Sequence, residues 1–83
     1  MDKSYLIKAH AHCTNNYNEL HNSKVCGCFY CRNIYNPNEI RKWIQGSELT
    51  AVCPYCNIDS VIGDAGGYPI TKEFLKEMHK EWF

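Results

Sequence analysis

Cys28-Phe-Tyr-Cys31 and Cys53-Pro-Tyr-Cys56, two Cys-x-x-Cys motifs separated by 21 residues, decide the fold of this chain. We call them the first knuckle (residues 28–31) and the second knuckle (residues 53–56). Each knuckle brings two sulfurs to one point, and the chain between them loops back with the second pair. The motifs therefore predict a closed tetrahedral Zn²⁺ site with the four ligands Cys28, Cys31, Cys53 and Cys56. Redox dithiols and iron–sulfur ligation are the alternatives for the same motif.

The length of the chain explains why a metal is expected. We predict that residues 1–83 form a single domain, whose hydrophobic core on its own stabilises a fold only narrowly. A structural Zn²⁺ adds stability because its binding free energy is also folding free energy. Three disulfides could do the same, but the N-terminus lacks the apolar run and cleavage site of a secretory signal. We therefore expect a cytoplasmic protein with reduced thiols.

Charge and hydropathy restrict the partners of the chain. Nine basic and nine acidic side chains give a formal net charge of zero, which argues against a broad attraction to nucleic acid. No apolar run has the length that a membrane span needs, so we expect a soluble protein that does not interact with membranes.

The sequence predicts an α+β fold in which short elements surround the knuckles. Ser4 is placed to cap a first helix. Asn16 and Glu19 resemble a capping box that begins a short second helix. We expect residues 1–23 to form a helical segment packed on the domain, with an apolar stripe of Leu6, Ala9 and Cys13.

A helix is predicted between the two knuckles. Asn36 supplies an N-cap, Pro37 stands at the first helical position, and Gly46 ends the helix as a left-handed cap. Ile40, Trp43 and Ile44 would then share one face, at spacings of three and four residues.

Two strands and a last helix follow. Residues 49–52 and 58–62 read as strands that flank the second knuckle, which would form the turn of a hairpin. Thr71 is placed to cap a C-terminal helix. We expect the core to include Ile40, Trp43, Ile44, Leu75, Met78 and Trp82.

Five segments carry a resemblance to a known family. They are Ala9-His-Ala-His12, Cys26-Gly-Cys28-Phe-Tyr-Cys31, Asn36-Pro-Asn-Glu-Ile40, Cys53-Pro-Tyr-Cys56-Asn-Ile-Asp-Ser-Val-Ile-Gly63 and Gly67-Tyr-Pro-Ile-Thr71. Together they resemble a family of short bacterial proteins described only as cytoplasmic proteins. The resemblance covers almost the whole chain and implies a bacterial cytoplasmic origin and metal binding at the two knuckles, with no activity attached. One departure is Asn57, where such knuckles more usually have glycine.

Two cysteines remain outside the predicted ligand set. Cys26 could exchange with Cys28 as a ligand, but the spacing from Cys28 to Cys31 matches that of the second knuckle. We expect Cys26 to be a buried or half-exposed thiol near the site, the alternative being a redox-active third thiol. Cys13 is expected in the core.

The histidines and two aspartates contain the residue types of a second, hydrolytic metal site. They are His10, His12, His21, Asp59 and Asp64. On a helix, however, positions i and i+2 point about 200° apart, so His10 and His12 would not share one ion. We expect one of the two to be packed or hydrogen-bonded and the other to be solvated.

Three functions are compatible with these features. The favoured one is a non-enzymatic zinc-binding module that recognises a protein partner through exposed aromatic side chains, with the candidates Phe29, Tyr30, Tyr35, Tyr55 and Tyr68. The second is single-stranded nucleic-acid binding through Arg32, Arg41 and Lys42, aided by Lys24 if folding gathers them on one surface. The third is a metal-dependent nuclease or hydrolase.

Overall fold

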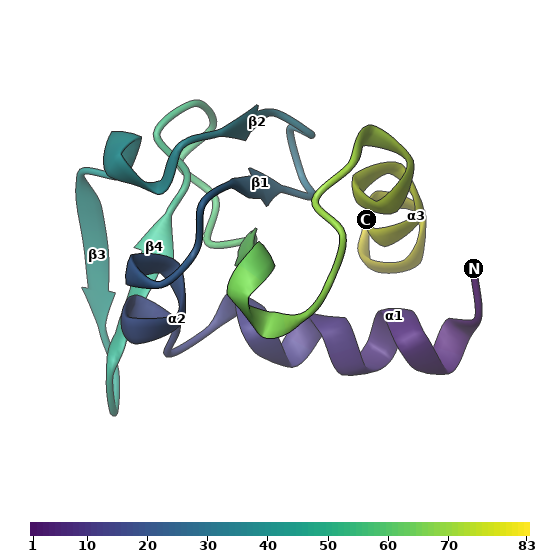
Figure 1. The fold of residues 1–83 in the computed structure, drawn as a ribbon, viewed down its shortest axis with the longest axis horizontal. Coiled ribbons are helices and arrows are strands. Elements are labelled where there is room, and N and C mark those ends of the chain that lie inside the picture. Colours follow the sequence, from purple (N-terminus) through teal and green to yellow (C-terminus); the bar gives the residue numbers. More distant parts are fainter.

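Three α-helices and two small antiparallel sheets make up the computed structural model, which describes residues 1–83 and confirms the α+β class (Figure 1). In chain order the elements are α1 (Lys3–His10), η1 (Ala11–Cys13), α2 (Tyr17–His21), β1 (Cys26–Cys28), β2 (Ile34–Tyr35), η2 (Pro37–Glu39), β3 (Lys42–Gln45), β4 (Leu49–Val52), β5 (Val61–Gly63), η3 (Asp64–Gly66) and α3 (Lys72–Trp82), where η denotes a 3₁₀ helix. None of these helices combines the length and the apolar character needed to cross a lipid bilayer.

Strand β1 is the centre of the fold. It pairs with β2 on one side and with β5 on the other, both antiparallel, so that Cys28 lies opposite Val61. Gly27 in this strand lies close to α3, where an added Cβ would come within 2.7 Å of a methyl group of Leu75. A glycine is therefore needed where the sheet and the last helix touch.

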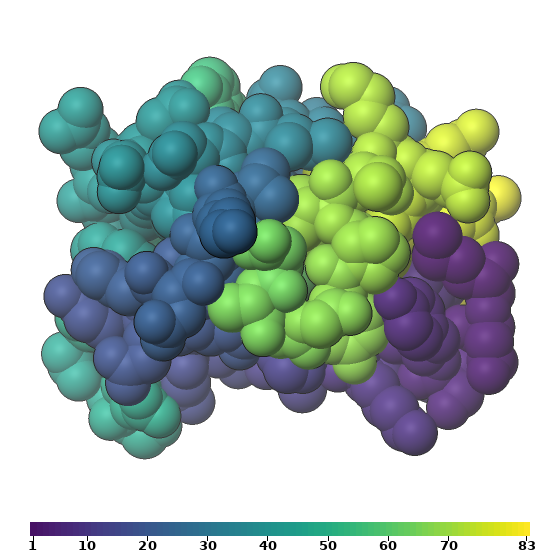
Figure 2. All heavy atoms as spheres, in the orientation of Figure 1, coloured from purple at the N-terminus to yellow at the C-terminus, as the bar shows by residue number.

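Two hydrophobic clusters form the core. The first joins α1, η1 and α3 to the sheet and consists of Leu6, Ala9, Cys13, Phe29, Ile62, Phe74, Leu75 and Met78. The second lies between the two sheets and consists of Leu20, Cys26, Cys28, Tyr35, Ile40, Ala51, Cys53 and Val61. The predicted N-terminal stripe is thus buried. In Figure 2 the N-terminal and C-terminal segments, purple and yellow, cover the same side of the molecule.

The predicted core is only half right. Leu75, Met78 and Ile40 are buried, but Trp43 is half-buried, and Ile44 and Trp82 are 47% and 37% exposed. The burial of Trp43 and Ile44 is predicted incorrectly because the predicted helix between the knuckles is not present there.

The helix predicted between the knuckles is wrong. Asn36 does act as a cap, because its side chain accepts a 2.8 Å hydrogen bond from the Asn38 N–H, but the helix ends after the single 3₁₀ turn η2. The chain then extends as β3, which pairs with β4 so that Trp43 lies opposite Ala51. Trp and Ile favour strands, and a spacing of three or four residues over so few positions does not distinguish the two structures. Gly46 lies in the hairpin turn and has no left-handed backbone.

The second knuckle is not the turn of a β-hairpin, although strands flank it as predicted. Strand β4 pairs with β3, and β5, which begins only at Val61, pairs with β1. Backbone hydrogen bonds from the Cys53 N–H to the Ile58 carbonyl and from the Asn57 N–H to the Cys53 carbonyl close the knuckle before the two strands separate. This separation places β5 beside the strand that ends in the first knuckle, and so brings the two knuckles together.

The helix starts are partly as predicted. Thr71 caps α3 by accepting a 3.1 Å hydrogen bond from the Phe74 N–H, as expected. Helix α1 is capped by Asp2 in place of Ser4. The capping box of α2 does not form, because the Asn16 side chain bonds to strands and that of Glu19 bonds to His12.

Candidate metal centre

The first knuckle is a tight turn closed by two backbone hydrogen bonds. The Arg32 N–H donates to the Cys28 carbonyl at 2.7 Å, and the Cys28 N–H donates to the Asn33 carbonyl at 3.1 Å. Between these bonds Arg32 adopts a left-handed backbone with a φ of 63°. The turn directs the side chains of Cys28 and Cys31 to the same side.

The second knuckle repeats this turn residue for residue. The Asn57 N–H donates to the Cys53 carbonyl at 2.9 Å, and the Cys53 N–H donates to the Ile58 carbonyl at 3.0 Å. Asn57 has a φ of 65°, so it takes the left-handed conformation for which glycine is more usual. Asparagine tolerates this region better than most residues, and the departure from glycine leaves the turn intact.

The two knuckles bring four sulfurs into one cluster. The Sγ atoms of Cys28, Cys31, Cys53 and Cys56 all lie within 4.8 Å of one another. Across the cluster, Cys28 and Cys56 are 3.6 Å apart and Cys31 and Cys53 are 3.7 Å apart. A tetrahedron with metal–sulfur bonds of about 2.3 Å has edges of about 3.8 Å, whereas a disulfide bond is about 2.05 Å long. The spacing therefore fits four ligands of one metal ion, and all four cysteines are free.

Hydrogen-bond donors surround the sulfurs. The Ser60 hydroxyl lies 3.2 Å from the Cys28 sulfur, the Asn33 amide donates to Cys31 at 3.3 Å, and the Tyr55 N–H donates to Cys53 at 3.4 Å. Such donors disperse the negative charge of a thiolate and stabilise metal-bound sulfur. The chemistry of the surroundings thus suits thiolate ligands better than neutral thiols.

Tyr35 provides a further test of this fit. Its hydroxyl is buried in the second cluster without a hydrogen-bond partner of good geometry. Burial holds the pKa of this hydroxyl well above its usual range, and a contact with the Cys53 sulfur acts in the same direction. A buried donor of this kind needs an acceptor, which a thiolate at Cys53 would provide.

Burial controls the protonation of the thiols in the absence of a metal. Desolvation raises the pKa of Cys28 and of Cys56. At Cys31 burial acts in the same direction, but hydrogen bonds from the backbone and side chain of Asn33, together with those to the Cys53 and Cys28 sulfurs, outweigh it and lower the pKa. Four negative sulfurs this close together require a cation, so metal binding must displace protons from the site.

The two remaining cysteines lie in the core. The cluster of four sulfurs leaves out Cys26, which is fully buried in β1, with its thiol 3.5 Å from the Tyr35 carbonyl. Burial raises the pKa of Cys26 to about 12 and that of Cys13 to about 11. Both thiols are therefore expected to be neutral at physiological pH.

No second group of three or more potential metal ligands exists. His12 pairs with Glu19 at 2.8 Å, whereas the ring of His10 packs on Trp82 at a centroid distance of 4.0 Å. His21 bonds to the Tyr17 carbonyl, and Asp64 accepts hydrogen bonds from two backbone N–H groups, so neither faces His10. Only Asp59 shares a hollow with His10, and His12 does not line that hollow.

The sequence gives no indication of the residues that support the sulfurs. Asn33 follows its knuckle by two positions, but Ser60 and Tyr35 reach the cluster only because β5 and β2 flank β1. Strand pairing of this kind is not visible in a local pattern.

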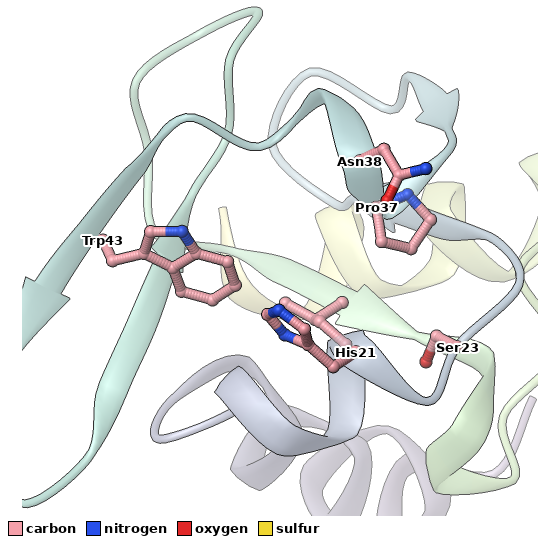
Figure 3. A pocket seen from close by; sticks show the side chains of 6 residues that line it. His21, Ser23, Pro37, Asn38 and Trp43 are labelled. Atoms are coloured by element: carbon pink, nitrogen blue, oxygen red, sulfur yellow. The ribbon is translucent and has the colours of Figure 1, made fainter.

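Another hollow lies beside β3 and α2. It has a volume of about 80 Å³ and is lined by Leu20, His21, Ser23, Pro37, Asn38 and Trp43. Figure 3 shows the rings of His21 and Trp43 turned toward the same space, with Pro37 and Asn38 from η2 on its far side. This hollow contains no charged cluster and no metal-ligating group besides His21.

No protein-family model, curated protein or solved structure matches this chain.

Proposed function

We propose that this chain is a small zinc-binding module in which Cys28, Cys31, Cys53 and Cys56 hold one Zn²⁺, and that the folded module binds a protein partner. The observation that carries the proposal is the pair of matching knuckles whose four sulfurs lie within 4.8 Å of one another, with the Cys28–Cys56 and Cys31–Cys53 distances close to the edge length of a zinc–thiolate tetrahedron. Zinc is favoured among metals because tetrathiolate sites with this ligand spacing are its characteristic structural sites.

The ligand set supports a structural role for the ion. Four thiolates fill all positions of a tetrahedron, whereas catalytic zinc sites keep one position open for water or substrate. The buried Cys28 and Cys53 belong to the second core cluster, and the half-buried Cys31 and Cys56 pack against it. The ion would therefore act as part of the core.

The surface around the first knuckle supports protein binding. Tyr30 and Phe83 are 43% and 58% exposed and contact each other edge to face at 4.9 Å. Phe83 also borders a hollow of about 220 Å³, with Phe29 and Ile58 among its lining residues. Exposed aromatic side chains beside a hollow are typical of protein interfaces. Of the other predicted candidates, Tyr55 is exposed and Tyr68 half-buried, whereas Phe29 and Tyr35 are buried.

Native mass spectrometry and X-ray absorption test the metal. We expect one zinc per chain in a shell of four sulfurs. The double variant His10→Ala/His12→Ala should keep one zinc, because neither histidine belongs to the cluster, and Cys31→Ser should lower the zinc content. A shell that contains nitrogen, or a Cys31→Ser variant with undiminished zinc content, would contradict the proposal.

Affinity capture with matched variants tests the partner. A protein that binds the zinc-loaded module should also bind Ile7→Ala, which alters an exposed residue outside the Tyr30–Phe83 pair. The double variant Tyr30→Ala/Phe83→Ala should no longer capture this partner protein, although it retains its zinc. Equal capture by all three proteins would contradict this interface.

Single-stranded nucleic acid is the second candidate, and it receives less support. The hollow that Arg32 borders is completed by Lys72 and Lys76 and includes neither Arg41 nor Lys42. Titration of labelled single-stranded DNA and RNA at about 0.15 M salt should give at most weak, salt-dependent binding.

A further inference from the structure

A hollow between the first knuckle and helix α3 is positively charged. Its volume is about 310 Å³, and its lining residues are Cys31, Arg32, Asn33, Lys72 and Lys76. All three charged side chains are cationic, and none takes part in any of the four ion pairs of the protein. In a chain with a net charge of zero, three unpaired cations around one hollow indicate a site for an anion.

The backbone of Arg32 provides a second, independent observation. This residue has a φ of 63° at the position where the second knuckle has Asn57. The left-handed region is unfavourable for a residue with a long side chain, and asparagine or glycine meets the same requirement at lower cost. A strained arginine at this position therefore indicates a role for its guanidinium group.

Helix α3 contributes the other two cations. Lys72 and Lys76 lie one helical turn apart, so their side chains lie on the same face of α3. Lys72 is also the first residue of this 11-residue helix, where the helix dipole favours negative charge. Two chain segments far apart in sequence thus converge on one hollow with the same sign of charge.

The metal centre limits the strength of this site without abolishing it. A zinc tetrathiolate carries a net charge of about −2, and Cys31 borders the hollow. The sulfur of Cys31, however, accepts a hydrogen bond from the Asn33 amide, and Cys28 and Cys53 are buried behind it. Arg32, Lys72 and Lys76 are exposed and can contact a ligand in the hollow.

We propose that this hollow binds a phosphate monoester, with Arg32 as the bidentate donor and Lys72 and Lys76 as the flanking cations. Guanidinium matches the oxygen geometry of a phosphate, and ammonium groups add charge. A concentrated site of this kind fits one terminal phosphoryl group better than a polymer, which requires a row of contacts along its backbone. The proposal rests on the zinc-loaded fold, and the phosphoryl group could belong to a small molecule or to a phosphorylated segment of the protein partner.

Nuclear magnetic resonance of the ¹⁵N-labelled, zinc-loaded protein tests this site. Inorganic phosphate, added at constant ionic strength, should shift the amide resonances of Arg32, Asn33 and Lys72 in a saturable way, with a dissociation constant below about 20 mM. Sodium chloride over the same range should not. A phosphoserine peptide that binds more tightly than phosphate would identify a protein segment as the source of the group, and equal affinity would identify a small phosphate.

Arg32→Asn is the decisive variant, because it copies the second knuckle and relieves the backbone strain. It should bind phosphate at least about tenfold more weakly, as should Lys76→Gln, which lies outside the knuckle. Arg41→Asn removes one positive charge elsewhere and should bind like the original protein. Zinc content is measured in each variant, so that loss of the metal is distinguished from loss of the anion site.

Three outcomes would overturn the proposal. They are shifts that grow linearly with phosphate, unchanged affinity in Arg32→Asn and Lys76→Gln when zinc is retained, and single-stranded DNA that binds more tightly than the phosphoserine peptide through the same residues. The last result would assign the surface to nucleic acid.

Discussion

The Asn16 side chain joins three segments of the chain inside the core. Its amide nitrogen donates to the carbonyls of His12 and Val61 at 3.1 and 2.9 Å, and its oxygen accepts from the Ala51 N–H at 3.0 Å. Asn16 is 1% exposed. A buried amide in this position connects β4 to β5, two strands that do not pair with each other.

Replacement of this amide should be costly. Asn16→Leu keeps the size of the side chain but removes the partner of one backbone N–H and of two backbone carbonyls, so we expect the free energy of unfolding to fall by about 2–4 kcal/mol. Urea denaturation of the zinc-loaded protein measures the loss. Asn22→Ala, at an exposed position, should change it by no more than about 0.5 kcal/mol. Equal stability of the two variants would show that the bonds of Asn16 contribute little.

We expect the hydroxyl of Tyr35 to contribute more to metal affinity than to the packing of the core. Tyr35→Phe keeps the ring but removes the hydroxyl near Cys53, so we expect the zinc affinity to fall about tenfold. Competition with a coloured chelator measures this. Tyr55→Phe is the matched control, because the Tyr55 hydroxyl bonds to Glu39 on the surface. Equal zinc affinities for both variants would remove Tyr35 from the support of the site.

At the scale of elements, strands β3 and β4 form a hairpin with one face toward the second core cluster. Trp43 packs against that cluster and lies 5.0 Å from the ring of Tyr17, whereas the neighbouring Ile44 is 47% exposed. Alternation of this kind is the two-residue period of a strand.

Because Trp43 is half-buried and Ile44 is exposed in this hairpin, we expect substitutions of the two residues to have different effects on stability. Trp43→Ala should lower the free energy of unfolding by about 1–3 kcal/mol, less than for a fully buried tryptophan. Ile44→Thr should be nearly neutral, since threonine is a good strand former at an exposed site. Thermal denaturation compares them. A large loss for Ile44→Thr would favour a helical segment that buries both residues.

Local patterns predicted some elements and missed others for a physical reason. The cap at Thr71 and the apolar stripe of α3 depend on residues within one segment, and each knuckle depends only on its own residues. The last helix and the two knuckles could therefore be predicted from the sequence. The partner of β5 could not, because its pairing with β1 joins residues that lie far apart in sequence, 33 positions for Cys28 and Val61 and 37 for Cys26 and Gly63. The prediction for the middle segment failed because its helix cap is real, whereas its strand depends on pairing with β4 across the turn at Gly46.

At the scale of the whole molecule, the second core cluster contains two of the candidate metal ligands, Cys28 and Cys53, and the other two, Cys31 and Cys56, pack against it. If the proposed metal is bound, its removal would leave four thiols close together beside the second cluster, without an ion to hold the two knuckles together. We therefore expect metal removal to affect the entire fold and not one loop.

A strong chelator should unfold the protein, and added Zn²⁺ should restore it. Circular dichroism follows the loss and recovery. Because burial raises the thiol pKa of Cys28 and Cys56 in the metal-free site, protons compete with the ion. Zinc affinity should therefore fall in acid, rise with pH and still be rising at the ordinary thiol pKa of 9.0. A metal-free protein with native circular dichroism would show that the hydrophobic clusters suffice.

The contact between the first and last helices has a consequence for synthesis in the cell. Helix α1 packs against α3, and the Trp82 indole donates to the Leu6 carbonyl across 76 positions of sequence. The first cluster therefore cannot close while α3 is still inside the ribosome. Until then the apolar stripe of α1 is exposed on a nascent chain, where chaperones can bind it.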